Sequence, residues 1–182
     1  MASRLAQLKR VLQSIVFTPI GFLIFATIAD AATPSSERGL LGHYYEGLHI
    51  GSYPTHITRV DRVIDFHNIS ELGALPSPSV VVWKGWIEAP VQGVYSFVIL
   101  ADDSGWLTID GNTVIADPGE SVSKFREEGS VPLIAGRHAI ELGQRNIWGD
   151  SSMQLRWQPP GHADELVPEN VLSLAPIADT SK

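Results

Sequence analysis

GVYSFVILADDSGWLTIDG, residues Gly93 to Gly111, is the stretch from which the fold can be predicted most directly. In its first half, β-branched and aromatic residues are so dense that we expect a buried β-strand. Beyond ADDSG, apolar and polar residues alternate from Trp106 to Asp110, which predicts a half-buried second strand. The pair Asp102-Asp103 would then lie at the tip of a hairpin. Because neighbouring carboxylates repel each other, we expect a compensating group: backbone N–H groups, a basic side chain, water or a hard cation such as calcium.

Similar strand patterns recur along the chain, separated by turns rich in glycine and proline. They predict strands over Leu40–Tyr45, Arg59–Phe66, Val80–Ile87, Val131–Ile134, His138–Leu142 and Met153–Trp157. Loops are expected from Asp117 to about Glu128 and from Gln144 to Ser152. Short strands at regular spacing with such turns are typical of all-β proteins, so we predict an antiparallel β-sandwich or barrel.

The N-terminus has the organisation of a secretory signal peptide. Three basic residues lie within the first ten, an apolar segment runs from Val11 to Ala29, and Ala29-Asp30-Ala31 offers small residues to a signal peptidase. The alternative is an uncleaved membrane anchor, but only Ile20 to Ala29 is densely apolar, which is short for a span of about 20 residues. We therefore expect residues 1–31 to be removed on export to an extracellular or periplasmic location, leaving residues 32–38 as a flexible lead-in.

Composition excludes several classes of function. The chain has 182 residues, 20 of them acidic and 13 basic, and no cysteine. Without residues 1–31 the net charge changes from −7 to −9, because three basic residues and one acidic residue are lost. An acidic domain lacks the basic patch that binding to nucleic acid or to an anionic membrane needs. The lack of cysteine excludes disulfides and thiol chemistry.

The chain contains, in this order, the segments GLLGHYYEG, RVIDF, VVWKGWIEAPVQGVYSF, ADDSGWLTIDG, LIAGRHAIEL and MQLRWQPPG. In this succession it resembles the PA14 domain family. The most specific parts are W-x-G-x-I-x-A-P-x-x-G-x-Y-x-F and, next along the chain, D-D-x-x-x-L-x-I-D-G. The resemblance runs roughly from Gly39 to Leu174. It implies a PA14-like β-sandwich of the jelly-roll type over residues 39–175, followed by a C-terminal tail over residues 176–182.

The resemblance also implies a calcium site. In carbohydrate-binding members of the family, two adjacent aspartates joined by a cis peptide bind calcium together with an asparagine and backbone carbonyls of a later loop. Sugar hydroxyls fill the remaining positions. Carried over to this chain, the ligands would be Asp102, Asp103 and Asn146, with the backbone carbonyls of Trp148 and Asp150. Calcium accepts about six to eight oxygen ligands in irregular geometry, so this set of groups suits it.

Two positions of the corner depart from the family pattern. Ser104 stands where the family usually has glycine, and Trp106 stands where the family often has a small or charged residue. Strand parity places Trp106 opposite Leu107 and Ile109, on the polar face beside the carboxylates. There it could stack on a sugar ring or pack under a neighbouring loop. Trp148, in the later loop, has the same two interpretations.

Other chemistries find less support in the sequence. The six histidines show no zinc-binding spacing, and the chain contains no G-x-S-x-G nucleophile motif. Asp110-Gly111 fits a type I′ hairpin turn. We therefore expect a secreted, non-catalytic module that binds cell-surface glycans through calcium held by Asp102, Asp103 and Asn146. The alternative is a structural or protein-interaction module in which the acidic pair only shapes a turn.

Overall fold

The computed structural model describes residues 37–48, 50, 55–67, 77–117, 119 and 125–174. The predicted signal peptide, most of the predicted lead-in and the predicted tail fall outside these residues. Within the described part, no helix combines the length and the apolar character that crossing a membrane requires.

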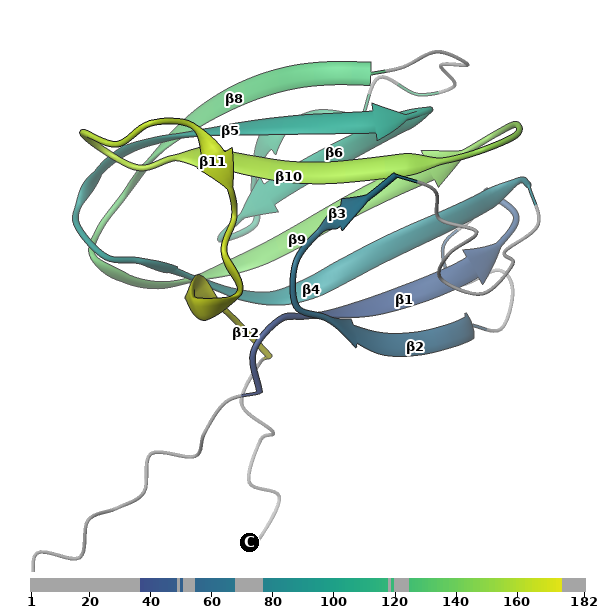
Figure 1. Ribbon diagram of the computed structural model, residues 1–182, viewed down its shortest axis with the longest axis horizontal. Helices are drawn as coiled ribbons and strands as arrows, with labels where there is room; N and C mark the ends of the chain where they lie inside the picture. Colours follow the sequence, from purple (N-terminus) through teal and green to yellow (C-terminus); the bar gives the residue numbers. More distant parts are fainter. Residues whose placement is uncertain are drawn as a thin grey trace, which may run out of the picture. The chain divides into compact units, whose positions relative to one another are not determined.

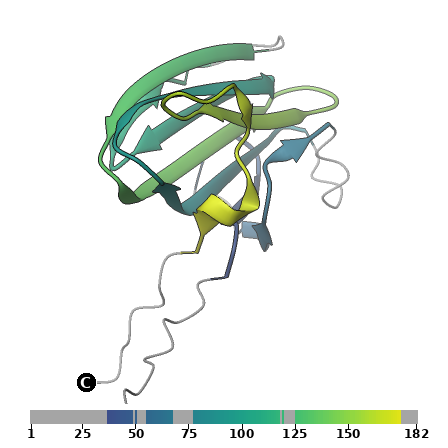
Figure 2. The same cartoon turned by 60° about the vertical axis from the view of Figure 1, so that its left-hand side comes forward.

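Two antiparallel sheets face each other, as the two views in Figures 1 and 2 show. Sheet A has the order β2 (Thr55–Asp61), β1 (Leu40–Glu46), β4 (Ser79–Ala89), β9 (Gly136–Asn146), β6 (Ser104–Ile109) and β7 (Asn112–Ile115), and β12 (Leu172–Ser173) pairs with β4. Sheet B has the order β11 (Glu165–Leu166), β10 (Ser152–Gln158), β5 (Gly93–Asp102) and β8 (Phe125–Leu133), and β3 (Asp65–Phe66) pairs with β10. A short 3₁₀ helix, η2 (Glu169–Val171), precedes β12. The predicted all-β sandwich is confirmed.

Inward-facing side chains of both sheets fill the space between them. Trp83 of β4 and the pair Tyr95 and Phe97 of β5 have no exposed surface, and Trp157 of β10 is almost fully buried. The rings of Tyr95 and Trp157 lie 5.6 Å apart in a tilted arrangement. Burying apolar surface contributes about 25 cal/mol per Å². A core of this kind stabilises the domain without disulfides.

The chain passes between the two sheets at two adjacent places. β5 of sheet B ends at Asp102 and β6 of sheet A begins at Ser104, whereas β9 of sheet A ends at Asn146 and β10 of sheet B begins at Ser152. The two crossings are neighbours because Asp102 pairs with Ser152. The predicted hairpin around Asp102-Asp103 is therefore wrong, since β5 and β6 belong to different sheets. Alternating polarity identifies strands but does not reveal which strands pair.

Three predicted boundaries are also wrong. The single strand expected over Arg59–Phe66 is interrupted at residues 62–64, and its two ends belong to different sheets. The loop expected over Asp117 to Glu128 is shorter because β8 begins before its end, paired with β5. The loop expected over Gln144 to Ser152 is shorter because β9 continues into it, paired with β4. Backbone ladders satisfy N–H and C=O groups whatever the side chains are, so polar residues continue these strands.

A buried carboxylate lies where the strand predicted over Arg59–Phe66 is interrupted. Asp61 is 2% exposed and accepts hydrogen bonds from the hydroxyl of Tyr44, from Trp83 Nε1 at 2.7 Å and from Arg59 Nε at 2.5 Å. Burial raises the pKa of Tyr44 above its ordinary value, and the hydrogen bond to Asp61 adds to this. The carboxylate thus ties the end of β2 to β1 and β4.

We expect Asp61→Ala to lower the free energy of unfolding by roughly 3–5 kcal/mol, because it leaves the donors of Tyr44 and Trp83 buried without an acceptor. Asp61→Asn keeps the shape and one acceptor oxygen, so its loss should be smaller. Urea denaturation of both variants measures the difference. Equal stability of Asp61→Ala and the wild type would contradict this role.

The Asp110-Gly111 turn joins β6 to β7 and also binds a buried histidine. Both residues have positive φ, +50° and +75°, as the predicted type I′ turn requires. Asp110 also accepts hydrogen bonds from His138 Nδ1 through Oδ2 at 2.6 Å and from the N–H of Ala139 through Oδ1 at 2.8 Å. His138 Nε2 lies 2.8 Å from the carbonyl of Ile134. Since a carboxylate and a carbonyl only accept, only the protonated imidazole can donate to both, so this arrangement favours the protonated form.

Burial alone would lower the pKa of His138, but the hydrogen bonds to Asp110 and Ile134 and the nearby negative charges raise it above 6.5. A raised folded-state pKa gives stability that is present below the unfolded value and lost as pH rises through the folded value. Urea denaturation across pH 6–9 should therefore show a loss of stability that His138→Gln lacks. Parallel curves for the wild type and His138→Gln would contradict the prediction.

Candidate functional site

The predicted site lies where the two crossings between the sheets meet. One crossing carries Asp102 and Asp103, and the other is the loop over residues 147–151, which follows Asn146 at the end of β9. Ser104 pairs with Arg145, so the first residue of β6 lies beside the end of β9. The Asp102-Asp103 peptide bond is cis.

Asp103 binds the chain on both sides of Asn146. Asp103 is 3% exposed, and its N–H donates to the carbonyl of Arg145 at 3.1 Å. Its Oδ2 accepts from the N–H of Ile147 at 2.6 Å and from the N–H of Trp148 at 3.2 Å. The two crossings are therefore joined by hydrogen bonds to a single aspartate.

Asn146 has a fixed amide orientation and a buried oxygen without a partner. It is 4% exposed, and its Nδ2 donates to Ser77 Oγ at 3.0 Å and to the carbonyl of Gly149 at 3.2 Å. Because a carbonyl oxygen only accepts, the atom facing Gly149 must be the nitrogen. Asn146 Oδ1 is buried and has no hydrogen-bond partner among the described residues.

Three more buried oxygens near the crossings lack a hydrogen-bond partner in the described part of the chain. They are Ser104 Oγ, Gln144 Oε1 and Ser151 Oγ. The Nε2 of Gln144 donates to the carbonyl of Asp102 at 2.6 Å, so this side chain also contacts the acidic corner. Leaving a buried polar group without a partner costs about 1–3 kcal/mol. A bound cation or water molecule would offset this cost.

The donor set around Asn146 fits calcium better than a transition metal. No group of three or more His, Cys, Asp or Glu side chains within the described ranges could hold a metal ion. A cation at this place would need amide and carbonyl oxygens in addition to the two carboxylates. Such all-oxygen sets suit calcium, whereas zinc prefers nitrogen and sulfur ligands.

Of the five predicted calcium ligands, the structure brings three together, and the roles of the other two stay predictions. Asp102, Asp103 and Asn146 lie at the adjacent crossings. The side chain of Trp148 is not buried by packing within the loop, since the residue is 75% exposed. Its backbone N–H donates to Asp103. The neighbouring carbonyl of Gly149 accepts from Ser77 and Asn146. Whether the carbonyls of Trp148 and Asp150 bind a metal stays a prediction.

Trp106 lies on the outer face of sheet A, as strand parity predicted, but its ring extends sideways across β9. A Cβ atom on Gly143 would lie 2.0 Å from Trp106 Cζ2, so the indole rests directly on this glycine. Trp106 Nε1 lies 3.4 Å from Glu141 Oε1, and the guanidinium of Arg145 lies 5.7 Å from the ring centre. Arg145 also forms an ion pair with Asp117, with Nε 2.9 Å from Oδ2 but without hydrogen-bond geometry. Contact of Trp106 with a sugar stays a prediction.

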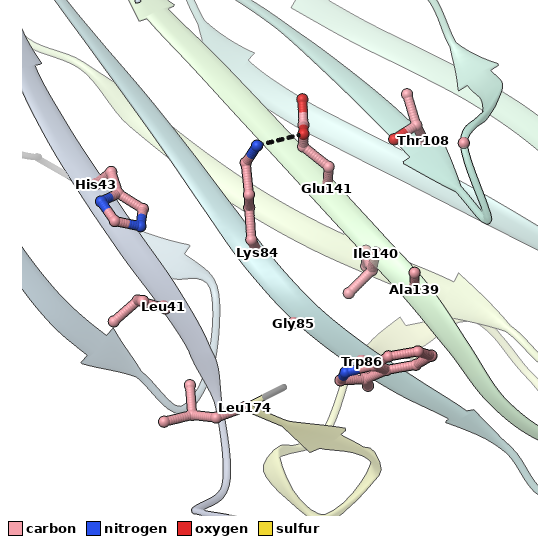
Figure 3. A pocket seen from close by; sticks show the side chains of 11 residues that line it. Leu41, His43, Lys84, Gly85, Trp86, Thr108, Ala139, Ile140, Glu141 and Leu174 are labelled. Carbon is pink, nitrogen blue, oxygen red and sulfur yellow. Dashed lines mark ion pairs between the residues drawn. The ribbon is translucent and has the colours of Figure 1, made fainter. Parts of the chain in front are cut away.

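A hollow also lies on this outer face of sheet A, and none of its lining residues is a predicted ligand. It has a volume of about 580 Å³, and its lining includes Leu41, His43, Trp86 and Thr108. Figure 3 shows the ion pair within it, between Lys84 Nζ and Glu141 Oε2 at 2.9 Å. None of the residues predicted to bind calcium lines this hollow. Its position therefore gives no support to the calcium site.

Comparison with known proteins identifies the fold. The PA14 domain family matches residues 36–170. No significant match to a curated protein was found. Among solved structures, an anti-sigma factor domain-containing protein from Clostridium clariflavum is similar with a TM-score of 0.67 and 25% identity, covering 77% of this chain and 49% of that one. A second structure described as an anti-sigma factor domain-containing protein is also only 49% covered, so the chain spans about half the length of both.

Two further similar structures are adhesin domains. The PA14 sugar-binding domain from an RTX adhesin has a TM-score of 0.66 and 19% identity, covering 77% of this chain and all of that one, 100%. The epithelial adhesin 9 A domain from Candida glabrata, solved in complex with Galb1-3GlcNAc, has a TM-score of 0.61 and 18% identity, covering 81% of this chain and 93% of that one. At such identities these two similarities concern the fold alone.

The packing of Trp106 on Gly143 leads to a test by double-mutant cycle. We expect Gly143→Ala to lower the free energy of unfolding by about 1–3 kcal/mol, because the new methyl group displaces the indole. In a Trp106→Ala background the same substitution should cost much less. Urea denaturation of the two single variants and the double variant measures the coupling. Additive effects would contradict the packing.

Proposed function

The chain belongs to the PA14 domain family, and from this premise we propose that it is a secreted, non-catalytic module that binds glycans through calcium. Asp102, Asp103 and Asn146 supply side-chain oxygens to the ion, with the backbone carbonyls of Trp148 and Asp150. Hydroxyl groups of a terminal sugar complete the coordination. When bound, calcium would supply positive charge that attracts sugar hydroxyls, and these residues would fix its position.

The buried Oδ1 of Asn146 is the observation that carries this proposal. Its amide nitrogen is held by Ser77 and Gly149, so the oxygen cannot exchange places with it without losing both hydrogen bonds. Asp103 forms hydrogen bonds with the residues on both sides of Asn146, namely Arg145 and Ile147. Hydrogen bonds therefore join the chain segments that carry a carboxylate and an unpaired amide oxygen, and both are ligand types that calcium accepts.

The loop over residues 147–151 also offers a surface for the sugar. Trp148 belongs to the 147–151 loop and exposes three quarters of its surface, 75%. An exposed indole beside an ion can stack on the apolar face of a sugar ring while the ion binds the hydroxyls. The sugar-binding adhesin domains that share the fold support a carbohydrate as the ligand. Export of the chain rests on the leader pattern of residues 1–31.

Calorimetric titration of the metal-free protein with calcium chloride tests the proposal. The expected dissociation constant is about 10⁻⁴–10⁻³ M, as in other extracellular calcium modules. Asp102→Asn combined with Asp103→Asn should abolish the binding heat, because it removes both negative charges from the site. Glu127→Gln combined with Glu128→Gln is the matched control: it also removes two neighbouring carboxylates, but these are exposed on β8 and are not proposed ligands, so binding should persist.

Glycan binding is then measured on an array of free and conjugated sugars, with calcium and with a chelator. The proposal expects binding that the chelator and the double aspartate variant both remove. If the wild type binds neither calcium nor any glycan, the structural or protein-interaction role takes its place. Glycan binding that survives the chelator would contradict the role of calcium.

A further inference from the structure

We propose that Ser77 is a positioning residue for the calcium site, an inference that rests on the proposed function. Ser77 does not contact the ion. Its hydroxyl holds the amide of Asn146 in the one orientation that presents Oδ1 to a cation, and it holds the adjacent loop in register with that amide.

The geometry places Ser77 at the centre of a closed set of hydrogen bonds. Its Oγ accepts from Asn146 Nδ2 at 3.0 Å and donates to the carbonyl of Gly149 at 3.1 Å. The same Nδ2 also donates to the carbonyl of Gly149 at 3.2 Å. A hydroxyl both accepts and donates, so it can join these two groups, which neither a pure donor nor a pure acceptor could do.

Ser77 reaches the loop because of the pairing between β4 and β9. Ser79, the first residue of β4, pairs with Asn146, the last residue of β9. The residue two positions before β4 therefore lies alongside the loop that follows β9. The backbone next to Ser77 is also held by a hydrogen bond of its own, because the N–H of Gly47 donates to the carbonyl of Pro78 at 2.8 Å. Loss of the Ser77 hydroxyl should leave this backbone hydrogen bond in place.

The orientation of the Asn146 amide decides whether the residue attracts or repels a cation. With Oδ1 towards the ion, the partial negative charge of the oxygen contributes to binding. After a flip, the NH₂ group would face the ion and oppose binding. Without Ser77 the nitrogen keeps one acceptor, the Gly149 carbonyl, so the preferred orientation is held less firmly. Changes to residues that orient metal ligands typically weaken metal binding by about 10- to 100-fold.

The test compares Ser77→Ala, Ser77→Thr and the wild type in calcium titrations of the metal-free protein. We expect Ser77→Ala to weaken calcium binding by about tenfold, at the lower end for such residues because one amide contact remains. Ser77→Thr keeps the hydroxyl and should restore binding to within about threefold of the wild type. Ser77 is exposed, so the melting temperature of the metal-free Ser77→Ala protein should stay close to that of the wild type.

A second measurement needs no calcium. In nitrogen-15 spectra of the metal-free wild type, the side-chain NH₂ of Asn146 should exchange slowly with solvent, because both of its hydrogens are bonded. In Ser77→Ala the exchange should be faster. Ser77→Thr should resemble the wild type.

Each outcome is decisive. Calcium binding by Ser77→Ala within twofold of the wild type overturns the inference and leaves the proposed function standing. Failure of Ser77→Thr to restore binding, unchanged NH₂ exchange in Ser77→Ala, or a large loss of metal-free stability also overturns it. If the wild type binds no calcium while Ser77→Ala still speeds the NH₂ exchange, the proposed function fails and Ser77 only orders the loop, so the inference fails with it.

Discussion

The hydrogen bonds of Asp103 are the interaction on which the arrangement of the site depends. A sandwich made by one chain must cross between its sheets, and this chain does so twice at one place, after β5 and after β9. Asp103 belongs to the first crossing and binds the backbone of the second at Arg145, Ile147 and Trp148. Its carboxylate is almost fully buried, so it depends on those N–H groups for the hydrogen bonds that water would otherwise supply. The positions of Asn146 and of the exposed Trp148 follow from this contact.

Aspartates have a second structural role at the other end of the strands of sheet A. Asp61 accepts hydrogen bonds from side chains of β1, β2 and β4, and Asp110 binds His138 of β9. Each of these carboxylates occupies a place where the chain turns or a strand stops. In all three cases an aspartate fixes an irregular piece of backbone to the regular sheets, because a carboxylate accepts several hydrogen bonds at once.

The sequence predicted the fold class and the central residues of the candidate site, and the limits of the prediction have physical causes. The acidic pair stands out in its own stretch of sequence, whereas Asn146 was predicted from the resemblance to the PA14 domain family, which has an asparagine in the later loop. The partners of β5 and β6 were mistaken because alternation along a strand contains no information about pairing. Ser77 was missed because it lies 69 residues from Asn146 and acts through the register of β4 and β9. A Ser-Pro pair between two strands looks like any other turn.

The position of the Trp106 ring shows a similar limit. Parity gave the correct face of the sheet, but the direction of the ring depends on residue 143 of a strand far away in sequence. Only the lack of a side chain at Gly143 lets the indole lie across β9. The contact of Trp106 with Gly143 thus follows from the pairing of β6 with β9, which the sequence of neither strand reveals alone.

The meeting of the two crossings has a thermodynamic consequence. An ion held there would take ligands from the end of each crossing and so would link sheet A to sheet B. A ligand that binds only the folded state adds RT ln(1 + [L]/Kd) to its stability, about 1.4 kcal/mol when its concentration is ninefold above Kd. The free energy of unfolding of such a domain would be lower in a calcium-poor compartment. It would rise in calcium-rich surroundings, where the ion would link the two sheets, so the stability of the fold would depend on the location of the protein.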